Sequence, residues 1–367
     1  MALETRVTRL PMAAPDDTSA LEALFDRGDL EASSIIAILG KTEGNGCVND
    51  YTRGYAVQSL RLLLARHLQP QGIDKICMIM SGGTEGALNP HWIVVSVDET
   101  ETRPRGKALA AARAMTRPML ASEIGRLTQV ELVAEAVGHA MDEALIADKA
   151  DVHFVQIKCP LLTSERVDTA GGPQQVATAD TLRSMGLSRG ASALGVALAL
   201  GECEMSGLSD QVIGADVSQY SSRASCSAGV ELMACEVLVL GMSDQWSGPH
   251  AIDHTVLADV VDLDAVHALL TRCLGPFSGQ LSSIQRGRVV ALLAKAEAAK
   301  SGIVRAKRHT MLDDSDISST RHARAFVGGM LAGVSGMTDL FISGGGEHQG
   351  PDGGGPCALI YSKGDNE

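Results

Sequence analysis

A short motif that occurs three times constrains this chain more than any other feature. A serine is followed by a small residue, a glycine, any residue and a glutamate, at Ser81–Glu85, Ser227–Glu231 and Ser343–Glu347. Glycine tolerates positive φ and lets a ligand approach the backbone, so such a turn can expose the serine hydroxyl and the adjacent N–H groups. One copy is typical of an ordinary surface turn. Three copies in 367 residues indicate internal repetition.

The segments around the three motifs follow one order. Each predicted unit has an apolar strand that ends at a lysine, a helix that carries an arginine, a strand that leads to the serine, and a further strand. The predicted strands are Val7–Leu10, Ser34–Leu39, Lys75–Met80, Trp92–Val97, Ala108–Ala112, Val152–Ile157, Val237–Leu240, Val289–Leu293, Asp339–Ile342 and Cys357–Tyr361. The predicted helices run through Leu21 to Phe25, from Tyr51, over Glu131–Asp148, from about Ser188 and from about Ala323.

This order predicts an α/β fold of three homologous domains. The repeat spans about 110–140 residues, which is too long for a solenoid. The charged segment Glu99–Lys107 contains proline and is the best linker, and a second boundary is predicted near Ser247–Asp253. The predicted domains are therefore 1–104, 108–249 and 254–367. Arranged about a pseudo-threefold axis, they would bring three lysines, three arginines and three serines to one centre.

Composition excludes several classes of function. The net charge of −13 argues against a nucleic-acid partner, which needs a basic surface. The longest apolar stretch, around Gly190–Leu200, is interrupted and too short to span a membrane, and the N-terminus lacks the apolar core of a signal peptide. The eight cysteines form no CxxC pair, which favours free thiols in a reducing cytoplasm.

Serine, lysine and arginine in one site predict amide hydrolysis without a metal. A neutral lysine can take the proton of a serine nucleophile, and both burial and a nearby arginine lower its pKa. Backbone N–H groups beside the serine can stabilise an oxyanion. Taken singly, each lysine or arginine is more often a surface charge and each serine turn only a turn. Repetition also permits a structural role, with serine and arginine holding loops around the axis.

The remaining polar motifs give weaker predictions. His322 and His348 lack the spacing of metal ligands such as HExxH and are expected to be satisfied polar residues. The glycine-rich tail Gly344–Gly355, together with Glu297, could surround a hard cation with oxygen atoms. Spacing alone makes this cation site the minority interpretation.

Several long motifs resemble those of the cyanuric acid hydrolase/barbiturase family. They extend over essentially the whole chain and are closer to the hydrolases than to the barbiturases. The motifs are Gly40–Arg53 (GKTEGNGCVNDYTR), Met80–Gly86 (MSGGTEG), His153–Thr163 (HFVQIKCPLLT), Ser188–Gly195 (SRGASALG), Arg308–Ala325 (RHTMLDDSDISSTRHARA) and Ser343–Pro351 (SGGGEHQGP).

The resemblance implies both an architecture and a reaction. Members of this family have three similar domains around a pseudo-threefold axis, with a central β-barrel ringed by helices, and they are usually homotetramers. They open the ring of cyanuric acid to carboxybiuret, which decarboxylates to biuret and CO2. The substrate is a small cyclic amide with threefold symmetry, so each domain can present the same side chains to one carbonyl. No catalytic cofactor is implied, but a structural Mg²⁺ or Ca²⁺ is.

The resemblance also implies roles for particular residues. Ser227 would be the nucleophile and Lys158 its base. The implied substrate-binding residues are Arg53, Ser81, Gly82, Arg189, Ala228, Arg324, Ser343 and Gly344, with Lys41 and Lys295 as additional site lysines. The implied metal ligands are Glu297, Gly346, Gln349, Gly350, Pro351 and Gly354, where Gly346 replaces a frequent alanine. Arg324 is preferred over Arg321 because Arg324-Ala-Phe matches Arg53-Gly-Tyr in register.

Two other functions remain open from the sequence. The first is a barbiturase, which performs the same chemistry on a pyrimidine ring. The second is a threefold small-ligand binding protein that has the same pocket and no catalysis.

Overall fold

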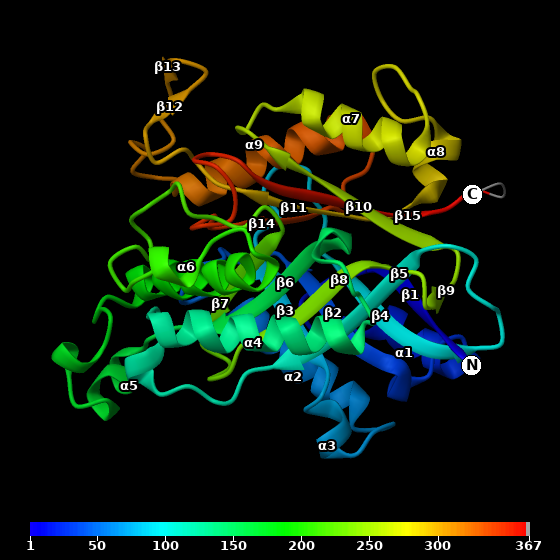
Figure 1. Ribbon diagram of the computed structural model, residues 1–367, viewed down its shortest axis with the longest axis horizontal. Coiled ribbons are helices and arrows are strands. Elements are labelled where there is room, and N and C mark those ends of the chain that lie inside the picture. Colours follow the sequence, from blue (N-terminus) through cyan, green and yellow to red (C-terminus); the bar gives the residue numbers. More distant parts are fainter. Residues whose placement is uncertain (365–367) are drawn as a thin grey trace.

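Three β-sheets with helices on their outer sides make up the protein, a computed structural model in which residues 1–364 are described (Figure 1). The first sheet contains β1 (Ala2–Pro11), β2 (Ile35–Thr42), β3 (Cys77–Gly82) and β4 (His91–Thr100). The second contains β5 (Ala108–Met115), β6 (Val152–Pro160), β7 (Ala224–Gly229) and β8 (Glu236–Ser243). The third contains β10 (His250–Leu257), β11 (Val289–Ala296), β14 (Phe341–Gly344) and β15 (Gly355–Ser362). The short strand β9 (Trp246–Ser247) pairs with β1, and β12 (Ile303–Val304) with β13 (Lys307–Arg308) forms a separate ribbon.

The three sheets share one strand order. It reads β3-β2-β4-β1 in the first sheet, β7-β6-β8-β5 in the second and β14-β11-β15-β10 in the third. The two strands that carry the lysine and the serine are parallel in every sheet, and the other pairs are antiparallel except that of β1 with the short β9, which is parallel. Each unit therefore repeats the same path of the chain, as the repeated motif predicts.

Helices follow the same order between the strands. A long helix joins the two parallel strands of each sheet, as a parallel connection requires. These helices are α2 (Tyr51–Leu64), α6 (Thr181–Leu200) and α9 (Ser319–Ser335). The other helices are α1 (Ser19–Arg27), α3 (Pro70–Ile73), α4 (Leu127–Glu143), α5 (Ser164–Thr169), α7 (Leu263–Leu274) and α8 (Ser283–Arg288). Aspartate side chains cap α2 and α6, where Asp50 accepts from the N–H of Thr52 and Asp180 from that of Arg183.

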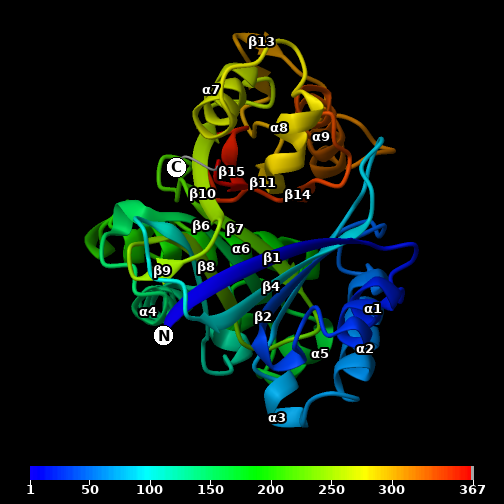
Figure 2. The same cartoon turned by 90° about the vertical axis from the view of Figure 1, so that its right-hand side faces the viewer.

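A shared apolar core lies where the inner faces of the three sheets meet. Leu39 and Ile93 come from the first sheet, Phe154 from the second, and Leu293 and Phe341 from the third. Each sheet packs its outer face against its own helices in a separate core. In the turned view of Figure 2, α7, α8 and α9 lie together at the top, α1, α2 and α3 at the lower right, and α4 at the lower left.

The predicted central β-barrel is not closed in the part of the chain that the structure describes. In the described residues the three sheets are not joined to one another into a closed ring of paired strands, apart from the short β9 that adds to the first sheet. The sheets meet through side chains such as Phe154 and Phe341 rather than through backbone hydrogen bonds. The three homologous α/β units and the surrounding helices are as predicted, and the barrel is open.

Several element boundaries also differ from the prediction. α6 begins at Thr181 rather than near Ser188, and α4 spans Leu127–Glu143 rather than Glu131–Asp148. All three serine strands extend through the serine, because β3, β7 and β14 end at Gly82, Gly229 and Gly344. β10 was not predicted, and its first four residues fall in the predicted boundary Ser247–Asp253. The domain limits 1–104, 108–249 and 254–367 stay a prediction. No described helix has the length and apolar character needed to cross a bilayer.

Candidate active site

The three lysines and three serines face one another across parallel strands. The backbone register pairs Lys41 with Ser81, Lys158 with Ser227, and Lys295 with Ser343. A register irregularity begins six residues before each lysine, at Ile35, Val152 and Val289. Equal strand order and equal register therefore place each lysine beside its serine by the same local geometry.

The serines converge on one point. The hydroxyl of Ser343 lies 3.3 Å from that of Ser81 and 3.1 Å from that of Ser227. All three serines are buried, and Ser227 retains the largest exposed fraction at 7%. Side chains more than 100 residues apart in sequence thus share one small volume, which the predicted pseudo-threefold arrangement requires.

One cavity contains all of the predicted substrate-binding residues and the predicted nucleophile. We call it the inner cavity; its volume is about 20 Å³. Its lining residues are Gly46, Arg53, Ser81, Gly82, Met185, Arg189, Ser227, Ala228, Arg324, Ser343 and Gly344. The three lysines do not line it and are fully buried behind the serines.

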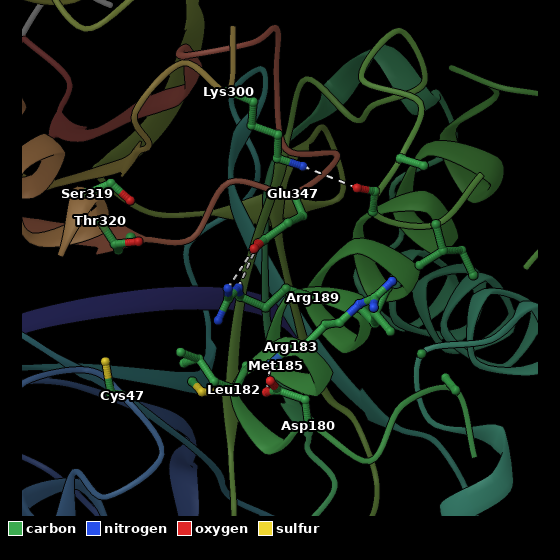
Figure 3. A pocket seen from close by; sticks show the side chains of 18 of the residues that line it. Cys47, Asp180, Leu182, Arg183, Met185, Arg189, Lys300, Ser319, Thr320 and Glu347 are labelled. Carbon is green, nitrogen blue, oxygen red and sulfur yellow. Dashed lines mark hydrogen bonds and ion pairs between the residues drawn. The ribbon is translucent and has the colours of Figure 1, made fainter. Parts of the chain in front are cut away.

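A much larger cavity opens beside the inner cavity. This outer cavity has a volume of about 810 Å³ and contains none of the three serines. It shares Gly46, Met185, Arg189, Arg324 and Gly344 with the inner cavity. Figure 3 shows its wall, with Leu182, Arg183 and Met185 of α6 on one side and Ser319 and Thr320 of α9 on another. The shared residues place the outer cavity directly beside the inner one.

Glutamates of the repeated motif hold two of the three arginines. Arg189 donates from Nε and Nη2 to the two carboxylate oxygens of Glu347, at 2.8 Å each (Figure 3). Arg324 donates from the same two atoms to Glu85, with Nε at 2.9 Å. Burial raises the pKa of Glu347, but the charge of Arg189 outweighs burial and lowers it to about 2. These two glutamates are therefore anions that fix the arginine forks beside the cavity.

The third arginine, Arg53, and the third motif glutamate, Glu231, depart from this pattern. Arg53 donates to the backbone carbonyl oxygens of Ala228 and Cys47, at 2.8 Å and 2.6 Å, and not to Glu231. Glu231 lies instead 2.7 Å from the Nζ of Lys158. Lys158 also donates to the carbonyl oxygen of Met80 at 2.8 Å, and among the described residues no hydrogen bond joins it to Ser227. The predicted catalytic pair thus has direct backbone register but separate side-chain partners.

The other two lysines do contact their serines. Lys41 Nζ lies 3.2 Å from the Ser81 hydroxyl, and Lys295 Nζ lies 3.1 Å from that of Ser343. Burial and the positive charge of Arg324 hold the pKa of Lys41 well below its usual range. Burial and Arg189 lower the pKa of Lys295 to about 7. Burial lowers the pKa of Lys158 too, but the carboxylate of Glu231 opposes this.

The predicted metal ligands gather only in part. Glu297, Gly346, Gly350 and Pro351 line one cavity of about 20 Å³, whereas Gln349 and Gly354 do not. Gln349 instead accepts from the backbone N–H of Cys226 at 2.7 Å, which ties this loop to the serine strand β7. Glu297 accepts from the N–H groups of Ala298 and Gly346, and burial and the nearby Glu347 raise its pKa. A carboxylate and several backbone carbonyl groups offer the oxygen ligands that a hard cation prefers, so the residues present fit one.

Histidines gave no metal-binding pattern in the sequence, yet one cluster has suitable geometry. His153, Asp253 and His254 bring their ligand atoms together in the described part of the chain. The Nδ1 atoms of the two histidines lie 2.9 Å apart, and Asp253 also pairs with Arg272 at 2.7 Å. His348 is satisfied as predicted, with Nε2 2.7 Å from the N–H of Gly214. His322 is satisfied by Asp314 at 2.9 Å.

The structure separates Arg324 from Arg321. Arg324 lines the inner cavity and is 3% exposed, whereas the Arg321 side chain is 43% exposed and lies outside it. Sequence reasoning assigned no role to Glu85, Glu231 or Glu347, although all three stand at the last position of the repeated motif. That fixed spacing from each serine is the signal that could have found them.

Comparisons with known proteins agree with this geometry. Residues 6–362 match the sequence profile of the family described as amidohydrolase ring-opening protein. A cyanuric acid amidohydrolase of Bradyrhizobium sp. (strain ORS 375) is 57% identical over 97% of both chains, and one of Azorhizobium caulinodans is 54% identical over 98% of both. The crystal structure of the cyanuric acid hydrolase from A. caulinodans superposes with a TM-score of 0.91 at 52% identity, covering 98% of this chain and 99% of that one.

A second solved structure bears on the repeated architecture. It is a cyanuric acid hydrolase described as an evolutionary innovation by structural concatenation, and it matches with a TM-score of 0.93 at 46% identity over 99% of this chain and all of that one. Concatenation agrees with three units of equal strand order. The match over almost the full length, together with the converging serines, lysines and arginines, shows that this chain belongs to the amidohydrolase ring-opening protein family.

Proposed function

We propose that this protein hydrolyses cyanuric acid to carboxybiuret, which then decarboxylates to biuret and CO2. The observation that carries the proposal is the inner cavity, where three serines and three arginines from equivalent positions surround one point. Cyanuric acid has three equivalent carbonyl groups, and each would meet one serine and one arginine. The names of the most similar relatives support the same substrate.

In the proposed reaction Ser227 is the nucleophile and Lys158 is its base. The Ser227 oxygen forms a bond to one ring carbonyl carbon while neutral Lys158 takes the hydroxyl proton. The tetrahedral intermediate collapses with cleavage of the C–N bond, and Lys158 returns the proton to the leaving nitrogen. Water then attacks the acyl carbon while Lys158 accepts its proton, the bond to Ser227 breaks, and Lys158 passes that proton to the serine oxygen as carboxybiuret is released. Backbone N–H groups near Ala228 would stabilise the oxyanion.

The other two units would bind and orient the ring. Ser81 and Ser343, with Gly82 and Gly344 beside them, would hold the two carbonyls that do not react. Arg53, Arg189 and Arg324 offer planar forks of donors to carbonyl oxygens. Lys41 and Lys295 would hold the non-reacting serines through the contacts described above. Correct orientation alone is a large part of the rate enhancement in such reactions.

Substitution of the three serines tests the choice of nucleophile. We expect Ser227→Ala to abolish ring opening, because the proposed acyl intermediate forms on the Ser227 oxygen. Ser81→Ala and Ser343→Ala are matched controls at equivalent positions, and we expect them to raise KM and to leave measurable turnover. Lys158→Ala should behave like Ser227→Ala. The measurement is the release of biuret from cyanuric acid by each purified variant.

The outcomes distinguish the rival assignments. Loss of turnover in Ser81→Ala or Ser343→Ala with near wild-type turnover in Ser227→Ala would move the nucleophile to another unit. Faster opening of barbiturate than of cyanurate by the wild-type protein would make it a barbiturase. Binding of the ring without product would support a threefold binding protein.

Three further assignments belong to the same proposal. A structural Mg²⁺ or Ca²⁺ would bind at Glu297 with the carbonyl groups of Gly346, Gly350 and Pro351, supported by the small cavity that these residues line. Gln349 and Gly354, which stand in the same loop, are the remaining proposed ligands of that ion. The protein would act in the cytoplasm as a homotetramer without a nucleic-acid or membrane partner. The resemblance to the family supports the tetramer, and the net charge of −13 argues against nucleic acid.

A further inference from the structure

The glutamate of each repeated motif lies beside the arginine of another unit. Glu85 of the first unit binds Arg324 of the third, and Glu347 of the third binds Arg189 of the second. Continued around the axis, this order assigns Glu231 of the second unit to Arg53 of the first. Glu231 and Arg53 are near enough that the arginine charge lowers the pKa of the carboxyl against the effect of burial, together with Lys158.

Arg53 and Glu231 do not form the hydrogen bonds that join the other two arginine–glutamate pairs. The Nε atom of Arg53 has no hydrogen-bond partner among the described residues, although it is buried. In Arg189 and Arg324 that same atom donates to the glutamate. The Oε1 atom of Glu231 lies 2.7 Å from Lys158 Nζ, but it too lacks a well-directed hydrogen bond among the described atoms. Glu231 therefore holds Lys158 by charge, while Arg53 Nε lies 3.8 Å from a carboxylate oxygen of Asp50 and makes no hydrogen bond among the described residues.

The backbone changes at the same place. Gly83 and Gly345, two residues after Ser81 and Ser343, have φ values of +107° and +79°. Gly229, two residues after Ser227, lies instead in the extended strand β7. A Cβ atom on Gly229 would lie 2.0 Å from a carboxylate oxygen of Glu231, so Glu231 folds back against this turn. Glycine can adopt either backbone conformation without a steric penalty, so the turn can take the form seen in the other two units.

We propose that Glu231 is a positioning residue that exchanges between two partners, holding Lys158 before the ring binds and pairing with Arg53 once the ring is in place. The proposal rests on the base role given to Lys158 above. While Glu231 lies beside it, Lys158 is an ammonium group and cannot accept the serine proton. When Glu231 moves to Arg53, Lys158 loses one proton to solvent and becomes the neutral amine that the reaction needs.

The size of the inner cavity gives a reason for the exchange. A volume of about 20 Å³ is near the space needed for a single water molecule, and a six-membered ring with three carbonyl groups is larger. Side chains at the wall must therefore move when the ring enters. Arg53 donates to the carbonyl oxygen of Ala228, next to Ser227, so a ring that meets Arg53 disturbs the turn that carries Glu231.

Other ionisable groups face this pair and must be controlled, and the Asp50 carboxylate lies 3.8 Å from Arg53 Nε. Glu236 on β8 stands opposite Lys158 in register and accepts from the N–H of Met78, and burial raises its pKa to about 7. Cys159 is adjacent to Lys158 on β6, and burial raises its pKa. Arg166 of α5 donates to the carbonyl oxygen of Val230, and its charge lies near Glu231. Of these groups, Glu236 has a pKa near neutral pH, so its ionisation could alter the pH profiles of activity.

The experiment compares two pH profiles of the full-length enzyme with cyanuric acid. The profile of kcat/KM reports the free enzyme, and that of kcat reports the complex. In the wild type we expect the rising limb of kcat/KM to lie at higher pH than that of kcat, because Glu231 leaves Lys158 on binding. In Glu231→Gln we expect the kcat/KM limb to move down by about one to three pH units and the gap between the profiles to close.

Matched variants separate this role from a structural one. Glu85→Gln and Glu347→Gln remove the equivalent carboxylates, and we expect a raised KM with the wild-type gap retained. Glu236→Gln should also retain the gap. An unchanged gap in Glu231→Gln, or an equal change in all three motif variants, would overturn the proposal. If Lys158→Ala keeps wild-type turnover, the base assignment fails instead, and the two failures are distinguishable.

A structure gives the second, independent readout. In Ser227→Ala with cyanuric acid bound, we expect the Glu231 carboxylate at Nε and Nη2 of Arg53, as in the other two pairs. The ligand-free variant should keep Glu231 at Lys158. A carboxylate that stays at Lys158 with the ring bound would contradict the exchange, whatever the pH profiles show.

Discussion

Arg324 and Arg321 lie one helical turn apart on α9 and both pair with Glu85, but they differ in what else they face. Arg324 lines the inner cavity, and Arg321 is largely exposed. We expect Arg324→Ala to lower kcat/KM by about ten- to a hundredfold, the loss of a charged hydrogen bond worth about 1.5–3 kcal/mol. Arg321→Ala is the control and should stay within about twofold, as exposed ion pairs contribute little. Equal effects of the two substitutions on cyanurate turnover would contradict this placement.

At the scale of residues, the sequence predicts which side chains gather but not how they pair. The lysines, serines and arginines could be predicted because each stands at a repeated position in a repeated element. The partner of Glu231 could not, since it depends on the backbone conformation at Gly229. Glycine permits both conformations, so the letters Ser-Ala-Gly-Val-Glu are compatible with either partner.

Helix α6 illustrates the limits of prediction at the scale of elements. Its start at Thr181 was missed, although Asp180 is a good N-cap residue. The helix is buried on nearly all sides, including polar and small residues such as Ser184, Ser188 and Gly190. A helix without an exposed face has no amphipathic stripe, and the 3.6-residue pattern that reveals most helices is therefore absent.

The packing of α6 against α4 depends on a glycine. A Cβ atom at Gly195 would lie 2.7 Å from the carbonyl oxygen of Val130 and from the Cβ of Val133. We expect Gly195→Ala to destabilise the protein by about 1–3 kcal/mol through overpacking. Gly138 on α4 has nothing within 4 Å of the added atom, so Gly138→Ala should stabilise by about 0.5–1 kcal/mol through the loss of backbone freedom in the unfolded chain. Thermal unfolding midpoints should move in opposite directions; a shared direction would refute the argument.

At the scale of the whole molecule, burying charged lysines near the axis has an energetic cost that depends on pH. The folded-state pKa of Lys41 is well below 10.5, so the unfolded chain binds more protons between the two values. Stability must therefore rise with pH across that window, up to the unfolded pKa. We expect Lys41→Met to flatten this rise, measured by urea midpoints at about pH 7 and about pH 9.

A surface lysine provides the control for this measurement. Lys75 is exposed, and Lys75→Met should keep the wild-type dependence of the urea midpoint on pH. If both variants keep that dependence, the charge of Lys41 is not what couples folding to pH. Burying Lys41 would then change the free energy of unfolding too little for the urea midpoints to detect.

The sequence predicts the three repeated units but not whether their sheets close into a barrel. Repetition of the motif predicts three units around an axis, and the equal strand orders agree. Whether neighbouring sheets join by hydrogen bonds depends on the lengths and directions of their edge strands. No repeated residue in the sequence indicates those lengths and directions. β10 was missed for a related reason: its sequence, HAIDHTVL, is partly polar and follows the short strand β9 closely.

The equal register of the three lysine–serine pairs has a consequence for encounters with the substrate. A planar ring whose three sides are alike presents the same outline after each third of a turn. It can therefore enter in any of three rotational orientations and still place a carbonyl carbon against Ser227, the proposed nucleophile. No reorientation within the cavity is needed, and the number of productive arrivals is three times that of a ring with only one reactive side. This statistical factor comes from the symmetry of the ring, and the equal register of the three units gives each of its sides a matching serine and lysine.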